Sequence, residues 1–138
     1  MQRLRLNPEL APGAVEELLR FDSPVQVNSR TALEPTELAG DAIAMGQLVL
    51  VLQGAANRDP ERFPEPDRLD IRRSDNVPLS FGWGAHHCIG APLARLEGEA
   101  VFNGLLARFD RIDLATEAVL WRPGITIRGL AALPVELS

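Results

Sequence analysis

The sequence predicts a mixed α+β fold that is mainly helical, with a small and irregular β portion. Residues 92–109 carry apolar side chains at helical spacing behind a proline. Residues 48–52 form a continuous apolar run of the length of one strand. Residues 60–78, rich in proline and charge, match neither pattern. The chain has 138 residues, the length of one ordinary domain, so we expect residues 1–138 to form a single domain.

Composition and charge exclude several classes of protein. Hydrophobic residues make up 46% and charged residues 24%, both ordinary for a soluble globular protein. A net charge of −5 and a pI near 5.0 argue against nonspecific binding of nucleic acid or of an anionic membrane. No apolar run approaches the roughly 20 residues of a membrane span, and no signal peptide follows Met1. The single cysteine excludes an internal disulfide and agrees with a reducing cytoplasm, where we expect the protein.

Shorter elements precede and follow the long helix. Residues 13–21 are expected to be helical after Pro12 and Gly13. The next elements are bounded by glycine or proline: extended pieces at 31–38 and 42–46 around a turn at 40–41, a buried strand at 48–52, and a helical turn at 55–60. Near the C-terminus, a turn at 121–124 leads into short strands at 125–130 and 133–135, which predict a β-hairpin.

The most unusual segment is residues 81–90, FGWGAHHCIG, which we call the cysteine loop. Pro92 suits the first turn of a helix, so Cys88 lies just ahead of a helix N-terminus. Free amides and the helix dipole favour a thiolate at that position. Glycines in the loop permit backbone angles closed to other residues and let a flat ligand approach: Gly82, Gly84 and Gly90. The apolar face of the helix is expected at Leu93, Leu96, Ala100, Val101, Leu105 and Phe109.

A stabilised thiolate fits three functions. Cys88 could be a nucleophile with a histidine base, a zinc ligand with His86 and His87, or an axial ligand of heme iron. A lone buried cysteine is also commonly an inert, small hydrophobe. Adjacent histidines do not readily turn toward one metal and no second cysteine exists, which disfavours zinc. Neither an oxyanion-hole loop nor a third orienting residue supports the nucleophile.

The run FGWGAHHCIGAPLAR resembles the heme-binding signature of the cytochrome P450 superfamily, in its soluble bacterial form F-G-x-G-x-H-x-C-x-G-x-x-L-A-R. The matching positions are Phe81, Gly82, Gly84, His86, Cys88, Gly90, Leu93, Ala94 and Arg95. The resemblance implies a heme b cofactor with Cys88 as the iron ligand. It also implies that His86 binds a heme propionate and that Phe81 packs beside the sulfur.

Two further motifs resemble the same family. Glu17 and Arg20 share a face of the predicted helix, where an exposed pair would contribute only about a few tenths of a kcal/mol. EELLR nevertheless matches the family's E-x-x-R motif, which implies a buried network with a second arginine, Arg73, that fixes the cysteine loop. Composition alone would make residues 60–78 a disordered linker. Because ANRDPERFPEPD resembles the family's meander, residues 55–80 are expected to be ordered.

Other roles follow only from position in the family. Arg30 would bind a heme propionate, which suits a guanidinium. Arg95 would form a local salt bridge or reach a propionate. The residues expected to border a substrate pocket are Val25, Gln26, Val27, Thr126 and Ile127. The segment RGLAALPV resembles the family's C-terminal end.

The resemblance runs from Leu4 to Val135 but covers roughly the C-terminal third of a typical member. The helix that crosses the distal heme face, with its acid–threonine pair, has no counterpart here. The resemblance implies a monooxygenase that oxidises a small organic substrate with O2 and electrons from a ferredoxin-type donor. The alternatives are a non-catalytic heme-binding module and an apo scaffold that forms a homo-oligomer through exposed apolar faces.

Overall fold

The computed structural model describes residues 2–138 and confirms the predicted mixed, mainly helical fold. The helices are α1 (Gln2–Leu6), α2 (Ala11–Phe21), α3 (Gln53–Ala56) and α4 (Ala91–Arg108), with short 3-10 helices at Pro8–Leu10 and Gly84–His86. The strands are β1 (Asn28–Thr31), β2 (Thr36–Leu38), β3 (Asp41–Ile43), β4 (Leu48–Val51), β5 (Ile112–Leu114) and β6 (Val135–Leu137). α1 and β5 were not expected from the sequence.

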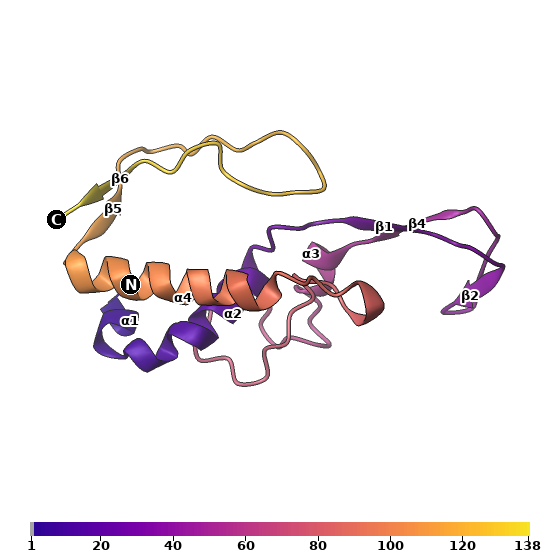
Figure 1. Ribbon diagram of the computed structural model, residues 1–138, viewed down its shortest axis with the longest axis horizontal. Helices are drawn as coiled ribbons and strands as arrows, with labels where there is room; N and C mark the ends of the chain where they lie inside the picture. The colour runs from indigo at the N-terminus through magenta and orange to yellow at the C-terminus, as the bar shows by residue number, and fades with distance from the viewer. Residues whose placement is uncertain (1) are drawn as a thin grey trace.

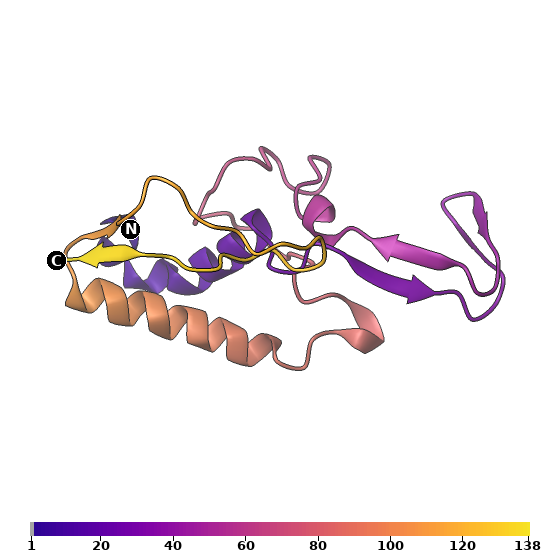
Figure 2. The same cartoon turned by 90° about the horizontal axis from the view of Figure 1, so that it is seen from above.

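The long helix α4 packs along α1 and α2 (Figures 1 and 2). The core between these helices is small: Leu4, Ala14 and Leu106 are buried together, with Leu10 and Ile71 packed against them. α2 and α4 approach each other closely at Gly98, whose missing side chain leaves room for Val15. These contacts hold α4, which begins directly after the cysteine loop, against α2.

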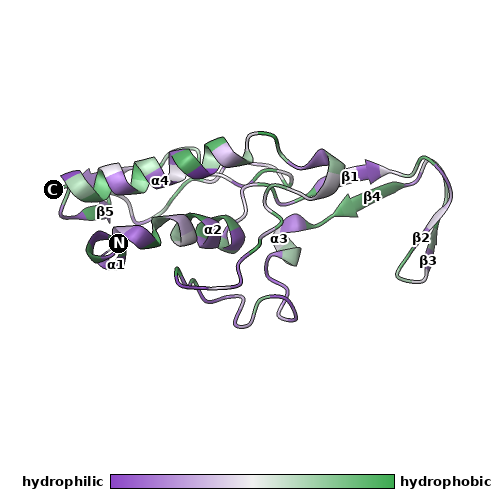
Figure 3. Cartoon of the chain, turned by 60° about the horizontal axis from the view of Figure 1, so that its bottom comes forward, coloured by the Kyte–Doolittle hydropathy of each residue, from purple (hydrophilic) through white to green (hydrophobic). Residues whose placement is uncertain are grey.

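The predicted apolar face of α4 is largely exposed and is not the face that packs on α2. Leu93, Leu96 and Val101 are 59%, 63% and 55% exposed, whereas Ala91 and Leu106 are buried. Apolar residues occur on more than one side of this helix, so their spacing did not identify a single buried face (Figure 3).

The strands of the central segment form a two-stranded antiparallel ribbon of β1 and β4 that points away from the helices, with the β2–β3 hairpin at its tip (Figures 1 and 2). The buried strand predicted at 48–52 was wrong, because Leu48 and Leu50 are 63% and 57% exposed. The apolar run is a strand, but no other part of residues 2–138 covers the two faces of the ribbon at these side chains.

The C-terminal segment closes an antiparallel pair between different residues from those expected. β6 pairs with β5, not with residues 125–130. Residues 115–134 form the long loop between them, in which Trp121 bridges Leu130. A second bridge, from Ile127 to Val25, attaches this loop to the segment that follows α2.

Residues 57–83 contain no helix or strand, although the structure describes every one of them. They are nevertheless packed: Phe63 is 2% exposed and its ring lies 5.3 Å from the Arg20 guanidinium. The segment therefore folds around a charged group and not around an apolar core. None of the helices within residues 2–138 has both the length and the apolar character that crossing a membrane requires.

Two glycines of α4 provide a matched test of the close approach to α2. A Cβ at Gly98 would lie 3.1 Å from both methyl groups of Val15, whereas a Cβ at Gly104 meets nothing within 4 Å. Because alanine favours helix, Gly104→Ala should raise the free energy of unfolding by about 0.5–1 kcal/mol. Gly98→Ala should be less stable than Gly104→Ala by about 1 kcal/mol or more, because overpacking against Val15 offsets the gain in helix propensity.

Urea denaturation followed by circular dichroism measures both variants against the unchanged chain. Equal stabilities of Gly98→Ala and Gly104→Ala would show that α2 and α4 are not in contact at this point.

Candidate functional site

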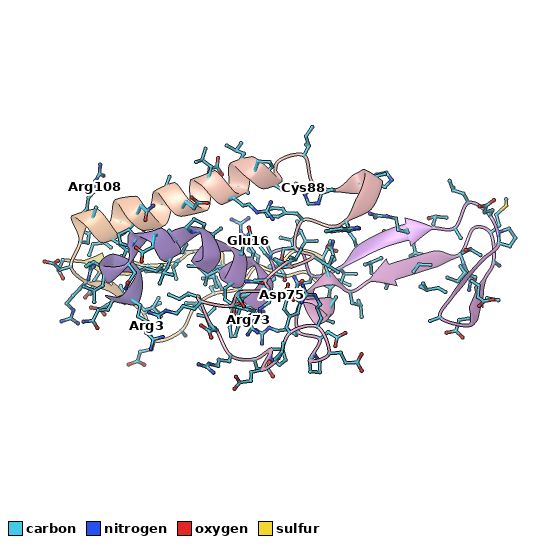
Figure 4. All side chains as sticks on the ribbon, turned by 90° about the horizontal axis from the view of Figure 1, so that it is seen from below. Arg3, Glu16, Arg73, Asp75, Cys88 and Arg108 are labelled. Carbon is cyan, nitrogen blue, oxygen red and sulfur yellow. The ribbon has the colours of Figure 1, made fainter. Side chains whose placement is uncertain are left out.

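The cysteine loop is held by its own backbone. The Cys88 amide donates to the Phe81 carbonyl at 2.9 Å, and the Ala91 amide donates to the Cys88 carbonyl at 3.2 Å. The His87 side chain donates from Nδ1 to the Gly82 carbonyl at 3.1 Å. Cys88 itself is exposed and lies beside the start of α4 (Figure 4). The thiol therefore sits at the positive end of a helix of 18 residues, on a closed turn of backbone.

The three glycines of the loop act in two ways. Gly82 and Gly84 have φ angles of +71° and +76°, which side chains rarely adopt, as expected. Gly90 has an ordinary φ of −82°, so the expectation of a special backbone angle was wrong there. A Cβ at Gly90 would lie 3.8 Å from the Cys88 sulfur. The absence of a side chain at this position leaves space beside the sulfur.

A cavity of about 260 Å³ opens beside the loop. It brings together six residues singled out from the sequence: Cys88, His86, Phe81, Gly82, Arg30 and Val25. Gln53 and Asn28, which the sequence did not indicate, also line it. The side-chain amide of Asn28 donates to Gln53 Oε1 at 3.2 Å. Apolar side chains, uncharged polar side chains and the Arg30 guanidinium thus line a cavity beside an exposed thiol.

The remaining pocket residues lie elsewhere. Gln26 and Val27 line a separate cavity of about 360 Å³ with Trp121 and Arg128. Thr126 contributes its backbone carbonyl, which accepts the Gln26 amide at 2.8 Å. Ile127 bridges Val25 and is 63% exposed. The five residues are therefore neighbours in space, but only Val25 lines the cavity that contains Cys88.

The structure brings Glu17, Arg20 and Arg73 together. Glu17 and Arg20 are completely buried and form a two-pronged pair, with N–O distances of 2.8 and 2.9 Å. Arg73 adds a contact of 3.2 Å to the same carboxylate. The Asp70 amide and the Asn76 side chain donate to it at 2.8 and 3.1 Å. The Glu17 carboxylate on α2 therefore anchors three residues of the segment 57–83, which contains no helix or strand.

The surroundings of Glu17 keep it ionised. Burial raises the pKa of this carboxyl group, but the hydrogen bond from Arg20 and that from the Asp70 amide lower it, as do the charges of Arg20 and Arg73. The lowering contributions outweigh burial, so the pKa of Glu17 lies below its ordinary value. The network therefore contains a carboxylate at neutral pH.

A second buried network joins α2 directly to the start of the cysteine loop. Asn57 is 0% exposed and donates to the hydroxyls of Ser23 and Ser80 at 2.7 and 2.9 Å. Its Oδ1 accepts the Leu79 amide at 2.7 Å. The Ser80 hydroxyl donates to the Leu19 carbonyl at 2.6 Å. Asn57 belongs to the ANRDP run already noted, but short polar side chains give no sequence signal of burial.

Arg95 forms an ion pair, but its partner lies on α2, 79 positions away, and is not local in the sequence. Its guanidinium binds both oxygens of Glu16, the residue before Glu17 on α2. It also lies over the Phe81 ring, 4.8 Å from the ring centre. Figure 4 shows Glu16 between α2 and α4, below the start of α4. Arg95 thus contacts α2 and the cysteine loop at the same time.

No group of three or more His, Cys, Asp or Glu side chains able to hold a bare metal ion occurs in the described chain, residues 2–138. The zinc alternative therefore has no ligand set here.

Comparison with known proteins agrees with this geometry. The profile of the family described as Cytochrome P450 matches residues 6–118. The chain is 46% identical over 137 residues to 6-deoxyerythronolide B hydroxylase of Saccharopolyspora erythraea, covering 98% of this chain and 34% of the relative. It is 47% identical over 136 residues to the biotin biosynthesis cytochrome P450 of Bacillus subtilis, covering 99% and 34%.

Solved structures show the same similarity. P450BioI, in complex with an acyl carrier protein ligated to hexadec-9Z-enoic acid, superposes with a TM-score of 0.95 at 47% identity, over 99% of this chain and 36% of that one. CYP109E1 of Bacillus megaterium, in complex with corticosterone, superposes with a TM-score of 0.94 at 36% identity, over 99% and 37%. The chain belongs to the cytochrome P450 family, a family of heme-thiolate monooxygenases. It spans about one third of the length of these curated relatives.

Removing the charge of Glu17 should destabilise the chain strongly. Glu17→Gln leaves the buried Arg20 guanidinium without its counter-charge, and we expect a loss of about 3–5 kcal/mol in the free energy of unfolding at pH 7. The exposed pair of Asp113 with Arg111 is the control, and Asp113→Asn should cost less than about 1 kcal/mol. Urea denaturation measures both.

The contribution of Glu17 to the free energy of unfolding should depend on pH. Because the pKa of Glu17 is lowered in the folded chain, its ionised form stabilises the fold above the unfolded pKa, about 4.3. That stabilisation is lost as pH falls through the lower, folded pKa. The difference between the unchanged chain and Glu17→Gln should therefore be full at pH 7 and shrink below about pH 4. A difference that stayed constant down to pH 2.5 would contradict an ionised Glu17.

Proposed function

We propose that this chain is the proximal heme-binding part of a heme-thiolate monooxygenase, with Cys88 as the axial ligand of iron. The observation that carries the proposal is the exposed Cys88 thiol on a closed loop, beside a cavity and at the start of α4. A bound iron porphyrin would supply oxygen activation, which an electron-rich thiolate ligand favours. The absent side chain of Gly90 leaves room for a flat group next to the sulfur.

The chain's own residues fit the remaining needs of heme b. Arg30 and His86 line this cavity and, together with Asn28, a second one, so both can donate to propionates. Phe81 and Val25 supply apolar walls. We assign to Phe81 the packing beside the sulfur, because its carbonyl already accepts the Cys88 amide.

A substrate site would lie where the segment after α2 meets the C-terminal loop. Val25, Gln26 and Val27 are tied to Thr126 and Ile127 by backbone hydrogen bonds and a bridge. We propose a small organic substrate and a ferredoxin-type electron donor, in line with relatives named as hydroxylases and monooxygenases.

We do not expect this chain alone to catalyse turnover. The chain spans about a third of its relatives, and the resemblance provides no acid–threonine pair on the distal side of the heme. Proton delivery to bound oxygen needs such groups. We therefore propose that the chain by itself binds heme without sustained catalysis, and that it forms a homo-oligomer through its exposed apolar faces.

Replacing Cys88 tests the iron ligand. The reduced chain, loaded with heme and treated with carbon monoxide, should show the red-shifted Soret band of thiolate-ligated iron, and Cys88→Ala should lose it. Trp83→Phe is the control, since Trp83 lies in the same loop with 74% of its surface exposed and should leave the band unchanged. A Cys88→Ala variant that kept the band would exclude Cys88 as ligand.

The exposed side of α4 should cause association. Leu93 and Leu96 are among the large apolar side chains left uncovered, and exposed patches of this kind promote contact between molecules. Light scattering coupled to size-exclusion chromatography should show an assembly larger than the 15.1 kDa chain. The double variant Leu93→Gln/Leu96→Gln should shift it toward monomer, whereas Leu33→Gln, at an exposed loop position, should not. A monomeric unchanged chain would contradict this proposal.

A further inference from the structure

Arg95 is the one side chain of α4 for which the structure shows both an ion pair to α2 and a contact with the cysteine loop. Its guanidinium binds Glu16 through two nitrogens and covers the Phe81 ring at 4.8 Å. Arg95 and Glu16 are 34% and 23% exposed, so water competes less for them than for the pairs at the surface. The hydrogen bond that Arg95 donates to Glu16 raises the pKa of Arg95, and the guanidinium remains charged.

The position of the Phe81 ring matters for the cysteine. The Phe81 carbonyl accepts the Cys88 amide at 2.9 Å, which closes the loop between its first residue and its cysteine. A cation over an aromatic ring is attracted to its face, more strongly when it is partly removed from water. A ring held in this way limits the movement of the Phe81 backbone and so of its carbonyl.

Glu16 makes this contact possible without reaching the loop itself. It pairs with the guanidinium from the α2 side, and a bidentate carboxylate fixes the plane of an arginine. The central carbon of this guanidinium lies over the Phe81 ring. An arginine without this partner would sample other rotamers at the start of α4.

We propose that Arg95 is a positioning residue for the cysteine loop: oriented by Glu16, its guanidinium holds Phe81 and thereby the closing hydrogen bond to Cys88. The consequence for iron ligation rests on the function proposed above, but the effect on the loop does not. The competing explanation is that the ion pair only ties α2 to α4. The two explanations differ in whether a positive charge must lie at position 95, over the ring.

Hydrogen exchange of the Cys88 amide in the heme-free chain tests the loop directly. Arg95→Gln should speed this exchange roughly tenfold, because the contact with the ring is lost. The charge-reversed pair Glu16→Arg/Arg95→Glu restores an ion pair between α2 and α4 but removes the cation from above Phe81. It should recover the stability of the helix pair in urea while keeping the fast exchange at Cys88.

Two internal controls accompany the measurement. The Asp70 amide, bonded to Glu17 at 2.8 Å, should exchange equally in all variants. Arg111→Gln removes an exposed pair far from the loop in sequence and should leave Cys88 exchange unchanged. Slow Cys88 exchange in the charge-reversed pair would show that the ion pair alone suffices, and would overturn the proposal. Unprotected Cys88 exchange in the unchanged chain would overturn it as well.

The heme-loaded chain gives the second readout. Arg95→Gln and the charge-reversed pair should lower the fraction of reduced, carbon monoxide-bound protein that shows the red-shifted thiolate band, and Arg95→Lys should recover part of it. A protected Cys88 amide with no thiolate band in the unchanged chain would count against the proposed function and leave the loop role standing. An unchanged thiolate fraction in Arg95→Gln would refute the consequence for ligation.

Discussion

The buried pair of Glu17 and Arg20 is the constraint on which the rest of the structure depends. Two charges removed from water are tolerated only when every donor and acceptor around them is paired. The chain meets this demand at Arg20 by bringing the Asn57, Pro66 and Arg68 carbonyls to its guanidinium, at 2.9, 2.9 and 3.3 Å, although the buried Oδ1 of Asn76 beside Glu17 has no partner. A segment without helix or strand thereby acquires a defined path that leads to the cysteine loop.

The two adjacent glutamates of α2 anchor the segments on the two sides of the cysteine loop. Glu17 anchors the segment that precedes the loop, and the Asn57 network completes this attachment at Ser80. Glu16 reaches the other side, because neighbouring residues of a helix point about 100° apart, and binds Arg95 of the helix that follows the loop. Each end of the loop is therefore fixed to the same short helix.

Sequence patterns predicted the motif residues far better than they predicted burial. The glycine-rich run and the E-x-x-R spacing led to Cys88 and to the three charged residues that the structure brings together. Apolar spacing in α4 and the apolar run in β4 did not predict which side chains are buried, because an apolar residue does not indicate which segment, if any, covers it. The pairing of Arg95 with Glu16 spans 79 positions of the chain, and spacing along one helix carries no information about it.

Contacts of such sequence separation also determine when the loop can form. The hydrogen bond of Ser80 to Leu19 and the contact of Arg73 with Glu17 span 61 and 56 positions, and both require α2 to be in place. Closing long stretches of chain is slow, since the entropy is lost before the contacts form. The loop should therefore be among the last parts to become ordered. Because Cys88 is also exposed in the folded chain, its sulfur remains accessible to oxidants both before and after the loop becomes ordered.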